Sequence, residues 1–206
     1  PTEVLAEAVR DAGVPTFVSA SATGFYGDTG SHEATETDSA GEGFLADLVT
    51  DWERAATENA GPDTRVVLLR TAPVLSPKGG MLAKLRPIFK LGLGGPIGDG
   101  KQYFSWISLV DELRAIEFVL DSSISGPVNL SAPEPVPFGT FVSALGHAVH
   151  RPAILPVPGF LARVAGGEMA EEMILISQRV VPAVLTDNDF TFDHPDIDTA
   201  LEYTRA

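Results

Sequence analysis

Two short apolar runs separated by an amphipathic helix constrain the fold of this 206-residue chain more than any other feature. The first run covers residues 14–18, and the second, Arg65–Thr71, contains Val and Leu without interruption from Val66 to Leu69. A continuous apolar run of this length suits a parallel strand that is buried on both faces. Helix and strand signals then alternate along the chain, which predicts an α/β fold.

Apolar residues at helical spacing predict the helices, and short extended runs predict further strands. Ser108 and Asp111 resemble a capping box and predict a helix from about 109 to 121. Pro87 should bend its helix or end it early. The helix after the first loop has an apolar stripe made of Phe44, Leu45, Leu48, Val49, Trp52, Ala55 and Ala56. The other predicted elements are helices at 3–12, 81–89, 138–149, 159–165, 167–177 and 197–203, strands at 102–107 and 126–131, and an edge strand around Phe190 and Phe192.

The stretch Ser19–Asp28 ends the first predicted strand in small and hydroxyl-bearing residues. Open α/β sheets bind ligands at the carboxyl ends of their strands. Ser21 and Thr23 therefore stand where a ligand site is expected. The alternative is that Ser21 satisfies the backbone of the loop, as Ser and Thr commonly do.

Composition and charge exclude several classes of protein. The net charge of −14 argues against general binding of nucleic acids. The chain has no cysteine, which excludes disulfides, and His147 and His150 have no carboxylate at ligand spacing, so we expect no metal site. No apolar run approaches the roughly 20 residues that cross a bilayer. Because no signal peptide is visible either, the sequence predicts a cytoplasmic protein.

Basic residues are concentrated in the middle of this acidic chain. Residues 65–114 hold eight Lys or Arg against three acidic side chains. Such a centre could attract an anionic small molecule, such as a phosphate or a nucleotide. The alternative is a solvated helix face that carries Lys84, Arg86 and Lys90.

Five stretches occur in one order along the chain: Ser21-Ala-Thr-Gly-Phe-Tyr-Gly27, Phe44-Leu-Ala-Asp-Leu-Val-Thr-Asp-Trp-Glu53, Leu91-Gly-Leu-Gly-Gly-Pro-Ile-Gly98, Gln102-Tyr-Phe-Ser-Trp-Ile107 with Asp111, and Gly167-Glu-Met-Ala170 leading to Gln178-Arg-Val-Val-Pro182. Together they resemble an extended short-chain dehydrogenase/reductase of the NAD-dependent epimerase/dehydratase type. The resemblance is closest to the atypical sugar-nucleotide epimerase-like branch with a small C-terminal domain.

The resemblance implies a Rossmann-like sheet whose first half carries a glycine-rich dinucleotide fingerprint. The cluster Gly92–Gly98 has the wrong spacing for that fingerprint and follows a helix instead of a strand. We therefore expect a partial Rossmann-like parallel sheet, its C-terminal part, with a small mixed substrate lobe and with the N-terminal half absent. The predicted regions are 1–150 for the second part of the NAD(P)-binding domain, with lobe insertions near 76–107, and 151–206 for a small C-terminal epimerase-associated region.

The resemblance also implies roles for residues at the strand ends. Ser21 matches a catalytic serine that hydrogen-bonds the substrate at the reacting carbon, and Tyr26 matches a substrate contact. A Tyr at this position can equally form a hydrogen-bonding wall of the pocket. The cofactor, NAD(P) and most simply NADP(H), would lie against Ala22, Thr23, Thr71, Ala72, Pro73 and Val74. On the residues alone, the segment 71–74 is as well explained as a simple strand exit.

One departure from the wider family concerns its Tyr-x-x-x-Lys pair, in which the Lys lowers the pKa of the Tyr. A phenol with a pKa near 10 needs such a cation to act at neutral pH. Aligned through Trp52, the Tyr falls at Phe44 or Leu45 and the Lys at Leu48 or Val49. None of these side chains can move a proton, so the proton donor stays unassigned.

Four residues are predicted to line a substrate pocket. The indole ring of Trp106 offers a flat face for stacking. The guanidinium of Arg179 can form two parallel hydrogen bonds to a phosphate or a carboxylate. Gln102 and Met81 complete the set, although Met81 is also a good core residue. Each of the four could instead belong to the core.

These observations support two functions. The first is an NAD(P)-dependent epimerase/dehydratase-like oxidoreductase that acts on a small polar substrate, with a nucleotide sugar as one candidate. The second is a non-catalytic NAD(P)H-binding sensor or scaffold that lacks the Tyr/Lys pair. A serine hydrolase is disfavoured because Ser21 lacks a Gly-x-Ser-x-Gly elbow. Extended family members often dimerise through helices equivalent to residues 41–60, so a homodimer is a candidate assembly.

Overall fold

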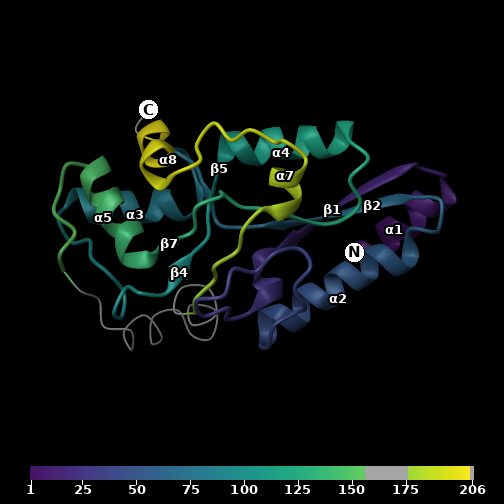
Figure 1. Cartoon of the computed structure of the whole chain (residues 1–206), viewed down its shortest axis with the longest axis horizontal. Coiled ribbons are helices and arrows are strands. Elements are labelled where there is room, and N and C mark those ends of the chain that lie inside the picture. Colours follow the sequence, from purple (N-terminus) through teal and green to yellow (C-terminus); the bar gives the residue numbers. More distant parts are fainter. Residues whose placement is uncertain (156–175, 205–206) are drawn as a thin grey trace.

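The structure of the chain is a computed structural model that describes residues 1–155 and 176–204 (Figure 1). The helices are α1 (Thr2–Asp11), α2 (Phe44–Asn59), α3 (Gly80–Lys90), α4 (Leu109–Asp121), α5 (Phe138–Ala148), α7 (Ala183–Asp187) and α8 (Ile197–Tyr203), with a 3-10 turn η1 (Thr23–Tyr26). The strands are β1 (Thr16–Ala22), β2 (Arg65–Thr71), β3 (Val74–Leu75), β4 (Tyr103–Phe104), β5 (Ile107–Ser108), β6 (Gly126–Leu130) and β7 (Val136–Pro137). The predicted helix 159–165 and nearly all of 167–177 lie outside the described residues.

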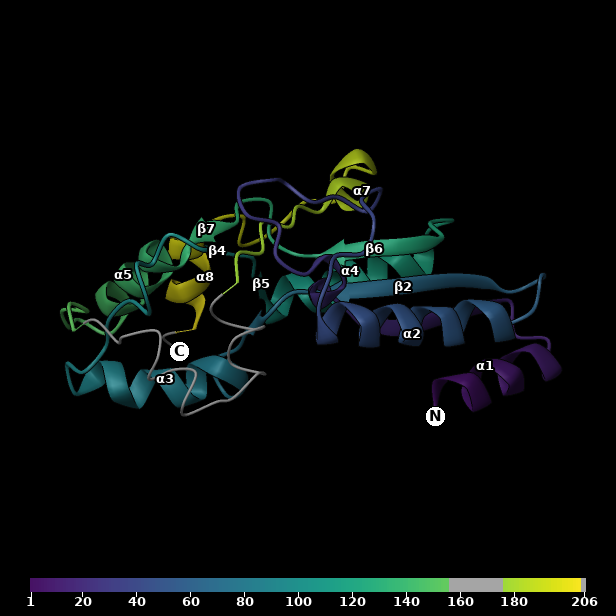
Figure 2. The same cartoon turned by 90° about the horizontal axis from the view of Figure 1, so that it is seen from below.

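The main sheet has the strand order β1-β2-β6, and both pairs of neighbours are parallel, which confirms the predicted α/β fold. Figure 1 shows α4 and α2 on opposite sides of β1 and β2, and Figure 2 shows α1 beside α2. Because side chains alternate along a strand, Phe17 and Leu68 pack toward α1 and α2, whereas Val67 and Leu69 pack toward α4. Each face of the sheet therefore has its own set of neighbours.

A second core lies at the other end of the molecule, between α3, α5 and α8 (Figure 1). Trp106, Phe141 and Leu82 are fully buried there. The C-terminal segment contacts both ends of the molecule. Helix α8 packs against α5 in the second core, and α7 packs against β6 of the main sheet. The segment 176–204 is therefore part of both cores.

Helix α2 buries a face that overlaps the predicted apolar stripe at Val49 and Ala56 but is rotated from it. Phe44 and Leu48 are 67% and 50% exposed, although both belong to the predicted apolar stripe. The buried residues of the helix are Ala46, Val49, Glu53 and Ala56. Small alanines let the helix approach β1 and α1 closely, and the buried carboxylate has an ionic partner on β2. Apolar spacing cannot reveal such a pair.

The other elements agree with the sequence at most positions. The hydroxyl of Ser108 caps α4 by accepting from the Asp111 N–H at 3.1 Å, as the capping box predicts. Helix α3 continues through Pro87 to Lys90, so the predicted early end is wrong. The predicted edge strand is wrong as well. Phe190 and Phe192 pack ring against ring instead, and Phe190 also meets the ring of Phe118 on α4.

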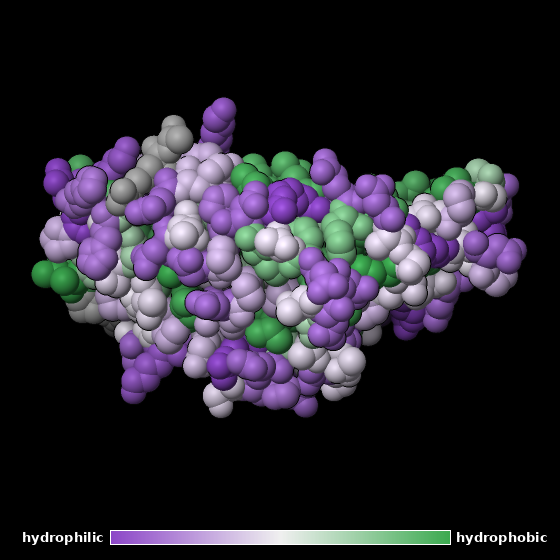
Figure 3. Space-filling model, turned by 45° about the horizontal axis from the view of Figure 1, so that its top comes forward, coloured by the Kyte–Doolittle hydropathy of each residue, from purple (hydrophilic) through white to green (hydrophobic). Residues whose placement is uncertain are grey.

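On the face of the molecule drawn in Figure 3, hydrophobic residues lie in separate small groups. Figure 3 shows one face of the molecule with such groups surrounded by hydrophilic residues. Among the described residues, no helix combines the length and the hydropathy needed to cross a membrane.

Candidate functional site

A cavity of about 460 Å³ lies at the carboxyl ends of β1 and β2. Strand β1 leads into η1 and β2 leads into the segment 72–75, so small residues from both strand ends form its floor. The cavity is lined by Ala22, Thr23, Gly24, Leu45, Val49, Thr71, Ala72, Pro73, Val74, Gly80, Met81 and Gln178. These include every residue predicted to touch the cofactor, together with Met81. The structure thus brings two distant segments of the sequence to one site.

Helix α2 contributes two hydrocarbon side chains to this cavity. Leu45 and Val49 lie one turn apart and both line it, whereas Phe44 and Leu48 are largely exposed. Of the four residues that are candidates for the Tyr and Lys positions, Leu45 and Val49 are the two that line the cavity. Because neither can carry a proton, any acid needed in the cavity has to come from another element.

The polar side chains that line the cavity are uncharged. Thr23 Oγ1 donates to Gln178 Oε1 at 3.4 Å, and Gln178 Nε2 donates to the Gly27 carbonyl at 3.4 Å. Thr71 Oγ1 donates to Glu112 Oε1 at 3.1 Å. Among the described residues, no charged side chain lines the cavity. Such a lining suits a flat, largely apolar group that needs few hydrogen bonds.

A row of polar residues crosses the sheet beside the cavity. Ser21 pairs in register with Arg70, and Arg70 pairs with Asn129, so all three side chains share one face. Arg70 Nε and Nη2 donate to the two carboxylate oxygens of Glu53, each at 2.8 Å. Ser21 Oγ donates to Glu53 Oε1 at 2.6 Å. The row thus contains a buried, bidentate ion pair between Arg70 and Glu53, and bidentate pairs are the strongest contacts between Arg and a carboxylate.

Tyr26 extends this row. Its hydroxyl accepts from Arg70 Nη1 at 2.9 Å and donates to Asn129 Oδ1 at 2.7 Å. The guanidinium of Arg70 also lies 3.5 Å from the centre of the Phe25 ring. Burial raises the pKa of Tyr26 above its ordinary value of 10.0, so the phenol stays protonated at neutral pH. Asn129 Nδ2 donates to the Val181 carbonyl at 2.9 Å, which ties the C-terminal segment to the row.

The two residues predicted to be catalytic, Ser21 and Tyr26, therefore have partners within the protein, and neither lines the cavity. Their catalytic roles stay predictions. The residues that hold them, Glu53 and Arg70, were missed as site neighbours. The sequence offers one signal, an Arg inside an otherwise apolar strand, and it does not indicate the partner of that Arg.

We expect Ser21→Ala to lower the free energy of unfolding by about 1–3 kcal/mol, because Glu53 loses a hydrogen bond from a buried hydroxyl. Urea denaturation measures this loss. Ser19→Ala is the matched control, since Ser19 is also buried on β1 but makes only a 3.3 Å contact with the adjacent Ala20 carbonyl. Unchanged stability of Ser21→Ala together with a large loss of turnover would instead favour the catalytic role.

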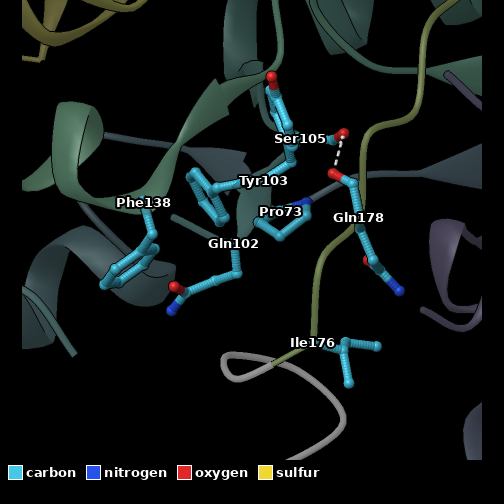
Figure 4. A pocket seen from close by; sticks show the side chains of 8 residues that line it. Pro73, Gln102, Tyr103, Ser105, Phe138, Ile176 and Gln178 are labelled. Atoms are coloured by element: carbon cyan, nitrogen blue, oxygen red, sulfur yellow. Dashed lines mark hydrogen bonds between the residues drawn. The ribbon is translucent and has the colours of Figure 1, made fainter. Parts of the chain in front are cut away.

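Gln102 lies beside a second, small hollow of about 10 Å³ (Figure 4). Its Nε2 donates to the Ile97 carbonyl at 3.2 Å. Ser105 Oγ donates to the Gln178 carbonyl at 2.8 Å across this hollow, the dashed contact in Figure 4. Pro73 and Gln178 line both spaces, so Gln102 lies behind the wall of the main cavity.

The other two predicted substrate residues lie elsewhere. Trp106 has no exposed surface and belongs to the second core, so the stacking face predicted for it is not accessible. Arg179 pairs with Glu33 at 2.7 Å, donates to the Ser31 carbonyl at 3.0 Å and lies over the ring of Tyr103. Its guanidinium therefore anchors the loop after β1 and does not line the main cavity.

A hollow of about 250 Å³ beside this loop is lined in part by Tyr26, His32 and Asp38. His32 Nε2 lies 2.6 Å from Asp38 Oδ1, and Asp38 Oδ2 accepts from the Thr35 N–H at 2.9 Å. In the part of the chain that the structure describes, no cluster of three or more His, Asp or Glu residues could hold a metal ion.

The contacts of Asp38 predict an acid-sensitive loop. The Thr35 N–H, with His32, lowers the pKa of Asp38 to about 2 from 3.8. Because the folded pKa lies below the unfolded one, the stabilisation is complete above pH 3.8 and is lost as the pH falls toward 2. We expect the stability difference between the parent and Asp38→Asn to shrink over this range in urea titrations. Asp63→Asn, at an exposed position, is the control for the general effect of replacing a carboxylate by an amide.

Two sequence families match the chain. Residues 2–130 match the NAD dependent epimerase/dehydratase family, and residues 157–204 match a domain of unknown function, DUF1731. The epimerase family protein Mb2239 of Mycobacterium bovis is 51% identical over 204 residues, which are 98% of this chain and 68% of that protein. The chain spans about two thirds of the length of the mycobacterial relatives it matches.

Two solved structures are similar over nearly the whole chain. The human epimerase family protein SDR39U1 (isoform 2), crystallised with NADPH, has a TM-score of 0.93 and 31% identity, covering 99% of this chain and 70% of that one. A nucleoside-diphosphate sugar epimerase from Corynebacterium glutamicum has a TM-score of 0.79 and 36% identity, covering 98% of this chain and 41% of that one.

Proposed function

Because the chain belongs to the NAD-dependent epimerase/dehydratase family, we propose that its cavity holds the nicotinamide end of NADP(H) in the full-length protein. The lining supports this proposal. Ala22, Ala72 and Gly24 leave room for a flat ring, and Leu45 and Val49 offer it an apolar face. The similarity to a human relative crystallised with NADPH supports the choice of NADP(H) over NAD(H).

The function we propose is an oxidoreductase of the epimerase/dehydratase type that acts on a small polar substrate, with a nucleotide sugar as the leading candidate. Bound NADP(H) would supply hydride transfer. The protein's own part is to orient the ring through the strand ends, to hold the amide of Gln178 near Thr23, and to exclude water with the α2 side chains. The match to a nucleoside-diphosphate sugar epimerase supports this substrate class.

A second function, a non-catalytic NADPH sensor or scaffold, is favoured by one observation. Leu45 and Val49, which are among the candidates for the positions of the family's Tyr and Lys, line the cavity with hydrocarbon side chains. Cofactor binding without turnover would then be the whole activity.

Binding and turnover separate these functions. The full-length protein is titrated with NADPH and NADH by fluorescence and then incubated with a panel of carbonyl compounds and nucleotide sugars. Tight NADPH binding with oxidation or epimerisation supports the enzyme, and binding without turnover at high protein concentration supports the sensor. If neither dinucleotide binds, both functions are wrong.

A further inference from the structure

One carboxyl group occupies a place on α4 where an apolar side chain is expected. Glu112, Ala115, Ile116 and Val119 are spaced by three and four residues and so share one helix face. Ala115, Val119 and, partly, Ile116 pack against the apolar side chains of β2 and β6. Glu112 continues this face at the end nearest the carboxyl end of β2. Only 9% of Glu112 is exposed.

Among residues 1–155 and 176–204, the carboxyl of Glu112 makes one side-chain contact. Its Oε1 accepts from Thr71 Oγ1 at 3.1 Å, and its buried Oε2 has no hydrogen-bond partner within these residues. Burial raises the pKa of Glu112 to about 7, against a smaller lowering by the Thr71 hydrogen bond. A buried carboxylate without a cation is costly, so the neutral acid is the favoured form below about pH 7.

The charged groups on the elements around Glu112 are engaged elsewhere. Strands β3 and β5, which pack against α4, contain no charged residue. Asp111, the preceding residue of α4, is paired with Arg114 at 3.1 Å and accepts from the backbone N–H groups of Asp193 and His194. Arg70 of β2 is bound to Glu53 on the opposite face of the sheet. Glu36, beside β6, accepts from the Asn129 N–H at 2.9 Å.

Thr71 connects this acid to the cavity. It is the last residue of β2, it lines the cavity, and its hydroxyl is the group bonded to Glu112. When the carboxyl is protonated, its O–H can donate to Thr71 Oγ1. The hydroxyl hydrogen of Thr71 can then point into the cavity, in competition with the Leu69 carbonyl, which lies 3.4 Å from Thr71 Oγ1. The arrangement therefore connects the carboxyl group of Glu112, which can give up a proton, to a cavity in which the α2 side chains Leu45 and Val49 cannot do so.

We propose that Thr71 and Glu112 form a proton-delivery pair, in which Thr71 is the catalytic group at the cavity and Glu112 is the positioning residue that restores its proton. The proposal rests on the proposed function, because it needs a carbonyl substrate and bound NADPH. In the reduction, the carbonyl π bond breaks, the carbon gains a C–H bond to the cofactor's hydride, and the oxygen gains an O–H bond to the Thr71 proton. The substrate is reduced and the nicotinamide is oxidised. Glu112 passes its proton to Thr71 and is reprotonated from solvent.

The first test needs no substrate. Oxidised nicotinamide carries a positive charge that the reduced ring lacks, so NADP⁺ in the cavity should lower the pKa of Glu112 and release protons near pH 7, whereas NADPH should not. Calorimetry of the full-length protein in two buffers of different ionisation enthalpy measures this release. We expect Glu112→Gln to abolish it and Glu117→Gln, at an exposed site on the same helix, to keep it. Binding of NADP⁺ with the same proton release in the parent and in Glu112→Gln would overturn the proposal.

The second test follows NADPH-dependent reduction of 9,10-phenanthrenequinone, a neutral dicarbonyl probe, across about pH 6 to 9. We expect kcat of the parent to fall above about pH 7, and kcat of Thr71→Val and Glu112→Gln to be about 100-fold lower and nearly independent of pH. Thr71→Ser keeps the hydroxyl and should retain most of the rate. Parent-like rates and pH profiles in both variants contradict the pair while leaving the oxidoreductase intact. NADPH binding without reduction of the probe overturns the proton-delivery step, and no cofactor binding overturns the proposed function itself.

Discussion

Replacing Arg70 by methionine should lower the free energy of unfolding by about 3–5 kcal/mol, the largest effect that we expect from a single substitution outside the two hydrophobic cores. The variant loses two hydrogen bonds to Glu53 and one to the Tyr26 hydroxyl. More importantly, it leaves the carboxylate of Glu53 buried without its cation, and in the part of the chain that the structure describes the Ser21 hydroxyl is its remaining side-chain donor. Urea denaturation followed by far-UV circular dichroism measures the loss.

Two controls separate the buried charge from the loss of packing. Arg54→Met breaks an exposed ion pair with Asp51 on the same helix as Glu53 and should change stability by no more than about 1 kcal/mol. The double variant Arg70→Met/Glu53→Met removes both charges and should be more stable than Arg70→Met alone. A double variant that is less stable than the single one would show that the uncompensated charge is not the cause.

Replacing Leu45 by tryptophan should raise the Kd of the full-length protein for NADPH by at least about tenfold. Leu45 lines the cavity from α2 next to Val49, so a larger ring at this position occupies space that the proposal gives to the nicotinamide. The side chain is partly exposed, and we therefore expect the fold to tolerate the change. Quenching of protein fluorescence by NADPH measures the Kd.

Leu48→Trp is the matched control for this experiment. Leu48 lies on the same helix, is 50% exposed and does not line the cavity. We expect its Kd to stay within about twofold of the parent value. An equal loss of affinity in both variants would indicate a general effect on α2, and no loss in Leu45→Trp would place the ring elsewhere.

The regular elements of the fold were predictable because their signals are local. The apolar run Arg65–Thr71 and the spacing of residues in α4 and α5 identify elements that the structure contains. The failures share a physical cause. Phe190 and Phe192 alternate like a strand, yet in the structure their rings pack against each other and the ring of Phe190 packs against Phe118. The conformation of such a segment depends on the side chains that it packs against in the folded protein. The spacing of its own residues does not identify these partners.

The candidate site was predictable only in part. Ala22, Thr23 and the segment 71–74 follow the ends of two parallel strands, and strand ends are where α/β sheets bind ligands. The polar row could not be predicted, because it depends on the register that sets Ser21 beside Arg70 and Asn129. Glu112 was missed for the same reason. Its sequence neighbours suggest an ordinary helix start, and only the packing of α4 on the sheet shows that it is buried against Thr71.

The central claim is that the nicotinamide ring lies in the cavity at the ends of β1 and β2. A crystal structure of the full-length protein with NADPH tests it most directly. We predict the ring within about 4 Å of Ala72 and Leu45, with its carboxamide on the side of Gln178 and Thr23. A ring bound outside this cavity, for example in the loop hollow beside His32 and Asp38, would contradict the account.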